Sequence, residues 1–167
     1  MTVSQYMRQV RQQCMEFVEE FDQKGGNLLF TGTTGRGKTF LTNCIAKELI
    51  DRCHSVIYLS AHDLFEVFSK YRFEAQTEEE MRDMHHFILE CDLLIIDDLG
   101  TELNNSFTSS QLFFCINQRL LNQKSTIIST NLSLNQLRDE YTDRVVSRMM
   151  SNYTVIPLYG EDIRLKL

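Results

Sequence analysis

A glycine-rich segment near the start of the chain has the residue types needed to hold a chain of phosphates. Residues 32–39 read Gly-Thr-Thr-Gly-Arg-Gly-Lys-Thr and fit the P-loop pattern Gly-x4-Gly-Lys-Thr. The segment follows an apolar run and opens a helical pattern, so backbone N–H groups and a helix N-terminus can face the phosphate oxygens. Lys38 is expected to neutralise the β- and γ-phosphates, and Thr39 to bind Mg²⁺ through its hydroxyl. The predicted ATP site contains Gly32, Thr33, Thr34, Gly35, Arg36, Gly37, Lys38, Thr39 and Phe40.

Two adjacent carboxylates follow a second apolar run, residues 93–96. A buried strand that ends in this way delivers a carboxylate beside a bound metal ion, the Walker B arrangement. Asp97 is assigned to Mg²⁺, directly or through water, and Asp98 is the candidate base or the residue that orients the attacking water. Glu102 is a second candidate for the base. A strand that simply ends in a solvated turn would show the same pattern, so the assignment depends on the P-loop upstream.

Three polar side chains further along the chain are candidates for contact with the γ-phosphate. Asn131 follows a strand-like run, where its amide can reach the γ-phosphate or the attacking water; the alternative is a turn residue at the strand end. Arg144 and Arg148 lie four residues apart and therefore share one face of a predicted helix. They are either solvated arginines paired with Asp143 or Glu140, or include an arginine finger that reaches the ATP of a neighbouring subunit.

An aromatic and basic stretch, residues 65–73, contains Phe65, Phe68, Lys70, Tyr71, Arg72 and Phe73. Such side chains can stack on the bases of single-stranded DNA and contact its phosphates. Phe65 and Phe68 also fit the core-facing side of a helix, so the stretch has a purely structural interpretation as well. His85 and His86 have no acidic or cysteine partner in register for a metal ion and are predicted to form a surface pair on a helix.

The pattern of apolar residues predicts the elements that position these side chains. Strands are expected over residues 27–31, 56–59, 93–96, 125–130 and 155–158, and a helical face begins at Phe40. Other helices are expected over residues 3–23, 61–72, 77–90, 107–122, 134–141 and 143–151, the last two capped by Ser133 and Thr142. Strands that alternate with helices predict an α/β fold, a three-layer P-loop sandwich with a mainly parallel sheet. The first helix either packs on this domain or forms a partner helix.

Composition limits the remaining possibilities. The 167 residues, 43% of them hydrophobic, fit one compact domain. The net charge of -6 gives no overall basic field, so DNA binding would need a local patch or an assembly of copies. The five cysteines form no CxxC pair and are predicted to be buried, reduced thiols. No apolar run has the length of a membrane span and no signal-peptide core is evident, so we expect a cytoplasmic protein with no membrane partner.

From about residue 27 to residue 164 the sequence resembles the AAA+ (ASCE-type) domain of the DnaC/DnaI-type bacterial replicative helicase loaders. It is also closely similar to the IstB-type transposition ATPases. Five segments carry the resemblance: Leu28–Gly32 leading into the P-loop, Leu94–Gly100, Ile128–Asn131, Arg144–Met149 and Gly160–Arg164.

The resemblance implies roles for individual residues and for the whole domain. Asn131 matches sensor 1, Arg148 the arginine finger, Arg144 a supporting arginine and Arg164 the C-terminal arginine near sensor 2. The family implies a homo-oligomer that forms with ATP, hydrolyses it and binds single-stranded DNA. In bacterial or phage DNA replication, such an oligomer helps to place a replicative ring helicase on the DNA.

Two departures from the family pattern keep other functions open. Asp98 stands where many AAA+ proteins have Glu. The loaders also carry an N-terminal segment that grips the helicase, whereas here a helix in residues 1–25 directly precedes the ATPase domain, residues 26–167. We therefore expect a fragment of a longer chain, weakly active on its own. The alternatives are an IstB-like helper acting on double-stranded DNA, an ATP-gated switch with little turnover, and a small-molecule kinase, which would leave Asn131 and Arg148 unexplained.

Overall fold

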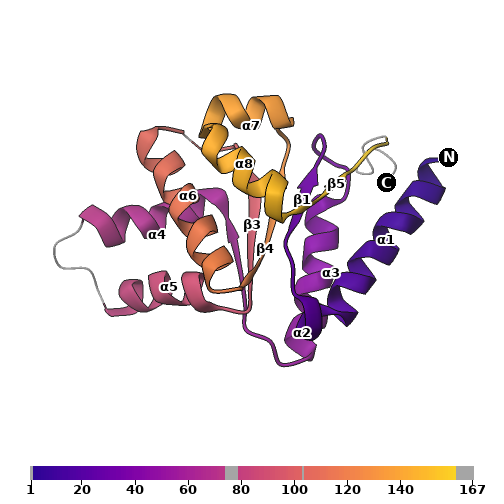
Figure 1. The fold of residues 1–167 in the computed structure, drawn as a ribbon, viewed down its shortest axis with the longest axis horizontal. Helices are drawn as coiled ribbons and strands as arrows, with labels where there is room; N and C mark the ends of the chain where they lie inside the picture. Colours follow the sequence, from indigo (N-terminus) through magenta and orange to yellow (C-terminus); the bar gives the residue numbers. More distant parts are fainter. Residues whose placement is uncertain (1, 74–78, 103, 161–167) are drawn as a thin grey trace.

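The computed structural model describes residues 2–73, 79–102 and 104–160 (Figure 1). Two helices come first, α1 (Val3–Glu19) and α2 (Phe21–Lys24), followed by β1 (Leu28–Thr31) and α3 (Lys38–Asp51). The middle of the chain forms β2 (Val56–Ser60), α4 (Ala61–Phe73), α5 (Glu79–Glu90), β3 (Leu93–Leu99) and α6 (Ser106–Leu121). The last elements are β4 (Ser125–Thr130), α7 (Leu134–Tyr141), α8 (Asp143–Asn152) and β5 (Thr154–Pro157).

The five strands form one parallel sheet in the order β2-β3-β4-β1-β5. All six residues of β4 and the first four of β3 are buried, as expected of parallel strands covered by helices on both faces. The predicted α/β sandwich with a parallel sheet is therefore confirmed. Because every strand runs in the same direction, the carboxyl ends of β1, β3 and β4 meet at one edge of the sheet.

One face of the sheet is covered by α3, and α1 packs outside it (Figure 1). Val10, Cys14 and Val18 of α1 are buried in the same cluster as Ile45 and Leu49 of α3. The first helix thus packs on the domain, one of the two predicted possibilities.

The predicted single helix over residues 3–23 is divided in the structure. Glu20, at φ −93° and ψ 4°, interrupts the expected helix 3–23 and separates α1 from α2. Along the helix Val18 is buried, whereas Phe17 is only partly buried and Val3 is 57% exposed. The buried residues follow the four-residue steps from Val10 to Cys14 to Val18, and the short α2 then turns Phe21 into the core.

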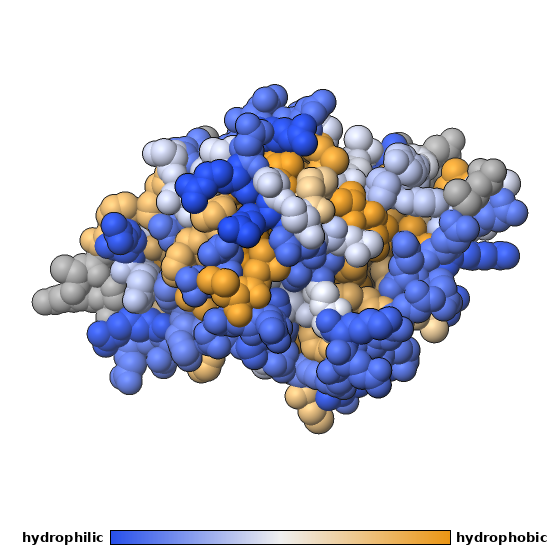
Figure 2. Space-filling model, viewed as in Figure 1, coloured by the Kyte–Doolittle hydropathy of each residue, from blue (hydrophilic) through white to orange (hydrophobic). Residues whose placement is uncertain are grey.

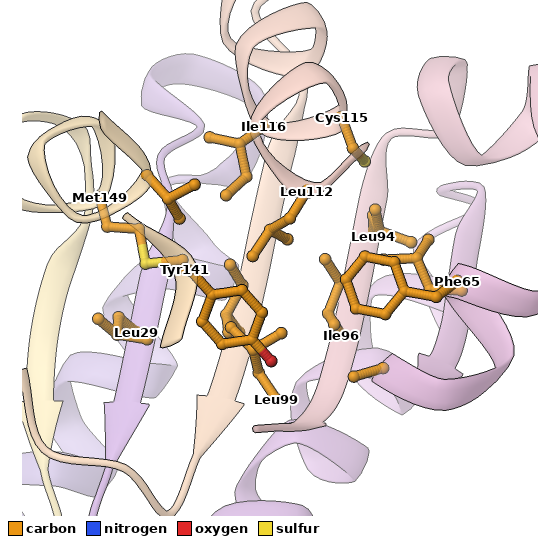
Figure 3. Close-up of a cluster of buried hydrophobic side chains, with 14 of the residues drawn as sticks. Leu29, Phe65, Leu94, Ile96, Leu99, Leu112, Cys115, Ile116, Tyr141 and Met149 are labelled. Atoms are coloured by element: carbon orange, nitrogen blue, oxygen red, sulfur yellow. The ribbon is translucent and has the colours of Figure 1, made fainter. Parts of the chain in front are cut away.

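The opposite face is covered by α4 to α8, whose apolar side chains form the larger core (Figure 1). In Figure 3, Tyr141 and Met149 lie over Leu29, while Phe65 lies against Leu94 and Ile96. The outer sides of α1 and α7 are mainly hydrophilic, with apolar residues between them (Figure 2). None of the helices in the described ranges has both the length and the apolar character that crossing a bilayer requires.

A fully buried arginine joins several elements at the end of the sheet where β4 begins. Arg119 of α6 donates hydrogen bonds to the carbonyl oxygens of Ile88 (2.8 Å), Cys91 (2.9 Å) and Ser125 (2.6 Å), and to Thr126 Oγ1 (2.9 Å). Each of these acceptors would otherwise be buried beside apolar side chains, where an unsatisfied polar group is costly. The guanidinium therefore connects α6, the end of α5 and the first strand residues of β4.

Most predicted boundaries agree with the structure within two residues. Helix α7 has the predicted bounds, and its N-cap is confirmed because Ser133 Oγ accepts the Gln136 N–H at 3.2 Å. Thr142 was wrongly predicted as a side-chain cap: its φ of 92° places it outside the usual cap conformation, and it makes no capping bond. Residues 77 and 78 of the expected helix 77–90 lie outside the described residues.

The cysteine prediction was correct for three of the five side chains. Cys14, Cys91 and Cys115 are buried free thiols, but Cys44 and Cys53 are exposed. Cys44 lies on the side of α3 that faces α1, in a groove between the two helices, and Cys53 lies in the turn after α3. Burial inside helix-covered apolar surroundings raises the pKa of Cys14 to about 11.

Candidate functional site

The glycine-rich segment forms the turn between β1 and α3, as the sequence predicted. Gly32 has a φ of 135°, and a Cβ atom at this position would lie 2.5 Å from the carbonyl oxygen of Leu158. Gly37 has a φ of 88° and immediately precedes α3, whose first turn has no side-chain cap. The first N–H groups of α3 are therefore not used by a capping side chain and can face an anion.

Lys38, the first residue of α3, is turned back over the loop. Its side chain is 5% exposed, and its ammonium donates to the carbonyl oxygen of Gly32 and to that of Thr33, the latter at 3.0 Å. The positive charge is thus held against the backbone of the loop. A phosphate bound there would lie beside a cation that is largely removed from water, where electrostatic attraction is stronger than at the surface.

Asp97 lies at the carboxyl end of the sheet and accepts hydrogen bonds from three hydroxyl groups. Oδ2 accepts from Thr39 Oγ1 at 3.2 Å and from the Tyr58 hydroxyl at 2.9 Å, while Oδ1 accepts from Ser129 Oγ. The structure therefore brings together Thr39 and Asp97, the two predicted metal-binding residues. Their hydroxyl and carboxylate oxygens are the ligand types that Mg²⁺ prefers, so the residues present fit this ion.

Tyr58 and Ser129 are functional-site neighbours that the sequence analysis missed. Tyr58 lies in the run 56–59, which was interpreted only as a strand, and Ser129 lies in a strand of mixed polarity. Burial raises the pKa of the Tyr58 hydroxyl to about 12. The sequence gives only a weak signal for these two residues. Each carries a polar group on the face of its strand that also holds an apolar residue two positions earlier, Val56 for Tyr58 and Ile127 for Ser129.

Strand β3 runs through both aspartates and ends at Leu99, three residues beyond its predicted end. The pairing of β3 with β4 shifts register between Ile96 and Leu99, and Asp98 has a φ of 55°. Its backbone N–H donates to Ser129 Oγ at 3.1 Å. This irregularity lets the two consecutive aspartates serve one site, because in a regular strand their side chains would point to opposite faces.

A cavity of about 470 Å³ collects most of the predicted site residues. Its lining consists of Thr34, Gly35, Gly37, Lys38, Thr39, Phe40, Asp98 and Asn131. Oδ1 of Asn131 is buried and has no hydrogen-bond partner within the described chain. An unsatisfied buried acceptor at a cavity wall is suited to a ligand or a water molecule that can donate to it.

Glu102, the second candidate base, is held away from this lining. Its Oε2 accepts the Gly100 N–H at 3.0 Å, and burial raises the pKa of its carboxyl group. Asp98 lines the cavity and Glu102 does not. The geometry therefore favours Asp98 over Glu102 as the carboxylate that faces a bound ligand.

A larger groove of about 730 Å³ adjoins the cavity and lies between α1 and α3. Gly37 and Phe40 line both spaces, and Phe40 is 69% exposed. Arg36 also lines the groove: its Nε donates to Thr33 Oγ1 at 2.9 Å, while its Nη1 is buried without a hydrogen-bond partner in the described residues. The groove can thus take a flat, partly apolar group next to the phosphate loop.

Arg144 and Arg148 share the exposed face of α8, as predicted. Their guanidinium carbons lie 4.2 and 5.9 Å from the centre of the Phe113 ring. Of the two alternatives, the solvated one holds in that both side chains are exposed, but the pairing with Asp143 or Glu140 is not found: neither arginine forms an ion pair within the described ranges, Asp143 pairs with Arg138, and both guanidinium groups lie near the Phe113 ring. Neither lines the cavity of their own chain. Arg164 lies outside the described residues.

The aromatic stretch divides into a buried half and an exposed half. Phe65 and Phe68 are buried in the core, whereas Tyr71 and Phe73 are 45% and 68% exposed. The Tyr71 ring stacks on His85 with a centroid distance of 3.8 Å and an interplanar angle of 7°. The predicted surface pair is therefore wrong for His85, which is half-buried and packs on Tyr71 and Phe68.

Exposed ligand-type side chains also gather at the start of α4. His62, Asp63 and Glu66 place their side-chain ligand atoms within 4.8 Å of one another, and all three residues are exposed. Glu66 already pairs with Lys70 at 2.7 Å. The group is thus a solvated cluster, and none of its three residues lines the cavity.

Comparison with known families identifies the chain. The model of the family described as IstB-like ATP binding protein matches residues 4–167. The chain belongs to this family. The matched range contains the loop, the paired aspartates and the residues that line the cavity.

Two curated relatives belong to different cellular processes. The insertion sequence IS232 putative ATP-binding protein of Bacillus thuringiensis subsp. berliner is 25% identical over 162 residues, which cover 93% of this chain and 63% of the relative. The replicative helicase loader DnaC of Escherichia coli (strain K12) is 26% identical over 147 residues, covering 88% of this chain and 59% of DnaC. The chain thus spans about three fifths of the length of these relatives.

Solved structures agree with the fold. The crystal structure of the DnaC helicase loader superposes with a TM-score of 0.79 at 24% identity, covering 92% of this chain and 90% of that one. AMPPCP-bound DnaA from Aquifex aeolicus gives a TM-score of 0.74 at 27% identity, covering 95% of this chain and 49% of DnaA. The P-loop AAA+ fold and the resemblance to DnaC/DnaI-type and IstB-type proteins are confirmed.

Proposed function

We propose that this IstB-like domain binds ATP with Mg²⁺ in the cavity at the start of α3 and hydrolyses it. The observation that carries the proposal is the approach of Thr39 Oγ1 to Asp97 Oδ2, 3.2 Å apart, with Thr39 and the buried Lys38 both lining the cavity. The N–H groups of the loop and of α3 would hold the phosphates. Thr39 and Asp97 would hold the Mg²⁺, which would supply positive charge against the negative charge that develops during phosphoryl transfer.

The nucleoside would lie in the groove between α1 and α3. Phe40 and Gly37 border both spaces, so a molecule whose phosphates occupy the cavity can extend into the groove without a break. The buried Nη1 of Arg36 offers a donor to a ribose or base oxygen or nitrogen. AMPPCP, an ATP analogue, is bound to the similar DnaA structure, which supports an adenine nucleotide as ligand.

Hydrolysis would use the two polar residues that line the cavity from the ends of β3 and β4. Asp98 would orient or deprotonate the attacking water, and the unsatisfied oxygen of Asn131 would accept a hydrogen from that water. The main-chain bond from Asp98 to Ser129 and the register shift of β3 fix the position of this carboxylate. A carboxylate held in place in advance needs little rearrangement in the transition state.

Turnover would require a second copy of the chain. Arg148 is exposed on α8 and does not line its own cavity, which suits a residue that acts on the ATP of a neighbour. Arg144 would support it from the same face, and Arg164 would contact the nucleotide of its own chain. ATP would then promote assembly, because each bound nucleotide supplies part of the contact between two copies.

The favoured biological role is that of a helicase-loader domain in bacterial or phage DNA replication. DnaC, which is 26% identical, is named a replicative helicase loader, and the exposed aromatic residues Tyr71 and Phe73 suit stacking on single-stranded DNA. The partners would be single-stranded DNA and a replicative ring helicase, in the cytoplasm. A transposition helper acting on double-stranded DNA is the second candidate, supported by the 25% identity to the IS232 protein.

Calorimetry of ATP binding with and without Mg²⁺ tests the nucleotide proposal. Binding that strengthens with Mg²⁺, together with release of inorganic phosphate, supports an ATPase. Tight binding without phosphate release would favour an ATP-gated switch, and absence of binding in folded protein would contradict the proposal. Anisotropy with labelled single-stranded and double-stranded DNA of equal length, in the presence of AMPPCP, then separates the loader from the transposition helper.

A further inference from the structure

A chain of hydroxyl groups leads from α3 through β2 to the Asp97 carboxylate. The Tyr58 hydroxyl lies 3.0 Å from Thr42 Oγ1 and 2.9 Å from Asp97 Oδ2. Thr42 is fully buried, and Tyr58 is partly buried against the core cluster that contains α3. Three elements that are separate in the sequence therefore meet at one phenol oxygen.

The number of available hydrogens limits the direction in which these hydroxyl groups donate. The phenol has one hydrogen, and an ionised carboxylate can only accept, so the Tyr58 hydrogen goes to Asp97. The Tyr58 oxygen is then available as an acceptor for the Thr42 hydroxyl, 3.0 Å away. Thr42 Oγ1 also lies 3.0 Å from the carbonyl oxygen of Thr39, a second acceptor for the same hydrogen. That carbonyl oxygen accepts from Asn43 Nδ2 at 2.8 Å as well, so it retains a side-chain donor when the Thr42 hydrogen is directed to Tyr58.

The second carboxylate oxygen is held from the other side. Ser129 on β4 donates to Oδ1 and accepts the Asp98 N–H, so its hydroxyl is fully used between the two aspartates. Strands β2 and β4 flank β3 in the sheet. Tyr58 and Ser129 thus hold the two oxygens of Asp97 from opposite neighbours, and the carboxylate is left facing Thr39.

We propose that Tyr58 is a positioning residue for the divalent cation: its phenol, oriented by Thr42, fixes the Asp97 carboxylate in the orientation that binds the metal. The proposal rests on the ATP–Mg²⁺ function proposed above. Groups that hydrogen-bond to a metal ligand change metal affinity by about 10- to 100-fold when they are removed. A tyrosine that merely fills the core would be replaced by phenylalanine without any effect on the metal.

The test is a Mg²⁺ titration of the ATP-bound protein, monitored with a fluorescent ATP analogue. Tyr58→Phe keeps the ring and removes only the hydroxyl. We expect its affinity for the nucleotide in EDTA to equal that of the wild type, while the Mg²⁺ midpoint rises about 10-fold or more. Tyr141→Phe is the matched control, because its fully buried hydroxyl has no hydrogen-bond partner in the described part of the protein.

Thr42, at the other end of the hydrogen-bonded row of hydroxyl groups, provides an independent variant that leaves Tyr58 intact. Thr42→Val should raise the Mg²⁺ midpoint in the same direction, whereas Thr42→Ser, which retains the hydroxyl, should keep it near the wild-type value. A wild-type midpoint in Tyr58→Phe, or in Thr42→Val if Tyr58→Phe does not fold, would overturn the positioning role while ATP–Mg²⁺ binding by the wild type still stands. Wild-type protein that binds no ATP–Mg²⁺ would contradict both proposals.

Discussion

The hydroxyl of Thr39 lies 3.2 Å from Oδ2 of Asp97, although 58 positions separate the two residues in the chain. Thr39 belongs to the first turn of α3 after β1, and Asp97 to β3, with β4 between the two strands. Parallel strands place both groups at the same edge of the sheet. Each residue is a plausible oxygen ligand by itself, and their proximity makes a single metal site the simplest interpretation.

Removal of the loop ammonium should abolish nucleotide binding. Lys38→Ala takes away the only side-chain cation that lines the cavity in the described residues, and we expect ATP affinity to fall by roughly 100-fold or more. Calorimetry measures the affinity directly. Lys47→Ala is the control, since Lys47 is exposed on the same helix and pairs with Asp51. Unchanged affinity in folded Lys38→Ala would rule out the phosphate site.

The two aspartates should separate binding from turnover. Asp97→Asn should weaken Mg²⁺-dependent binding of ATP, because a neutral amide is a poorer ligand for a hard cation. Asp98→Asn should bind ATP–Mg²⁺ normally and hydrolyse it about 100-fold or more slowly, because its carboxylate acts only in the transition state. Binding isotherms and phosphate-release rates distinguish the two effects. If Asp98→Asn retains the wild-type rate, Glu102→Gln becomes the variant to measure for the base.

Arg148 should act between copies of the chain. Arg148→Ala is expected to bind ATP normally but to lose roughly 1000-fold in turnover, as when an arginine finger is removed. The specific activity of the wild type should rise with protein concentration. A mixture of Arg148→Ala with Lys38→Ala should recover part of the wild-type activity, because an interface between the two variants combines the intact loop of one copy with the intact Arg148 of the other.

Arg138→Ala serves as the control for a helix-surface arginine with an ion pair, here to Asp143 at 4.0 Å. Its turnover should match the wild type. If the specific activity of the wild type does not change with protein concentration, and Arg148→Ala has the same specific activity, the trans-acting role is excluded.

The exposed half of the aromatic stretch should contribute to single-stranded DNA binding. Each base stacked on an aromatic ring is worth about 1–3 kcal/mol, so joint replacement of Tyr71 and Phe73 by alanine should weaken binding about 10-fold or more. Anisotropy with AMPPCP and a range of salt concentrations gives the measurement. Phe114→Ala, at an exposed phenylalanine on α6, is the control. Equal affinity in the double variant would limit these rings to packing on His85 and Phe107.

The buried guanidinium should be a large contributor to stability. Arg119→Met leaves the carbonyl oxygens of Ile88, Cys91 and Ser125 without this donor, and we expect the free energy of unfolding to fall by about 2–4 kcal/mol. Urea unfolding monitored by circular dichroism measures the change. The exposed variant Arg138→Ala should differ from wild type by no more than about 0.5 kcal/mol. A similarly small effect of Arg119→Met would show that water replaces the lost donors.

The features that the sequence predicted correctly are those encoded by neighbouring residues. The alternation of apolar runs with amphipathic segments predicted the parallel sheet, and the spacing of glycines before Lys38 predicted the turn between β1 and α3. Helix α7 was predicted with its bounds from Ser133 as the N-cap, and the structure shows that Ser133 forms a capping box with Gln136, within four consecutive positions. The same kind of signal was misleading at Thr142. Threonine is a common N-cap residue, but the backbone of Thr142 does not adopt the cap conformation.

The features that the sequence did not predict depend on contacts across the fold. Tyr58 and Ser129 become part of the site only because β2 and β4 flank β3. Arg119 was overlooked because a charged residue in a helix is usually exposed, and its buried acceptors come from two other segments. The attraction of Arg144 to Phe113 likewise depends on how α8 packs on α6.

The close approach of Gly32 to Leu158 has a mechanical consequence. The carbonyl group of Leu158 leaves no room for a methyl group at Gly32, so the loop and this residue pack closely, and the Leu158 N–H is bonded to the Thr31 carbonyl oxygen at 2.7 Å. Just before it, the Pro157 carbonyl oxygen accepts from the Tyr6 hydroxyl at 2.5 Å. The loop, the end of β5 and α1 are therefore joined by consecutive contacts, so a displacement of the loop toward Leu158 would press on a strand end that is hydrogen-bonded to a surface helix.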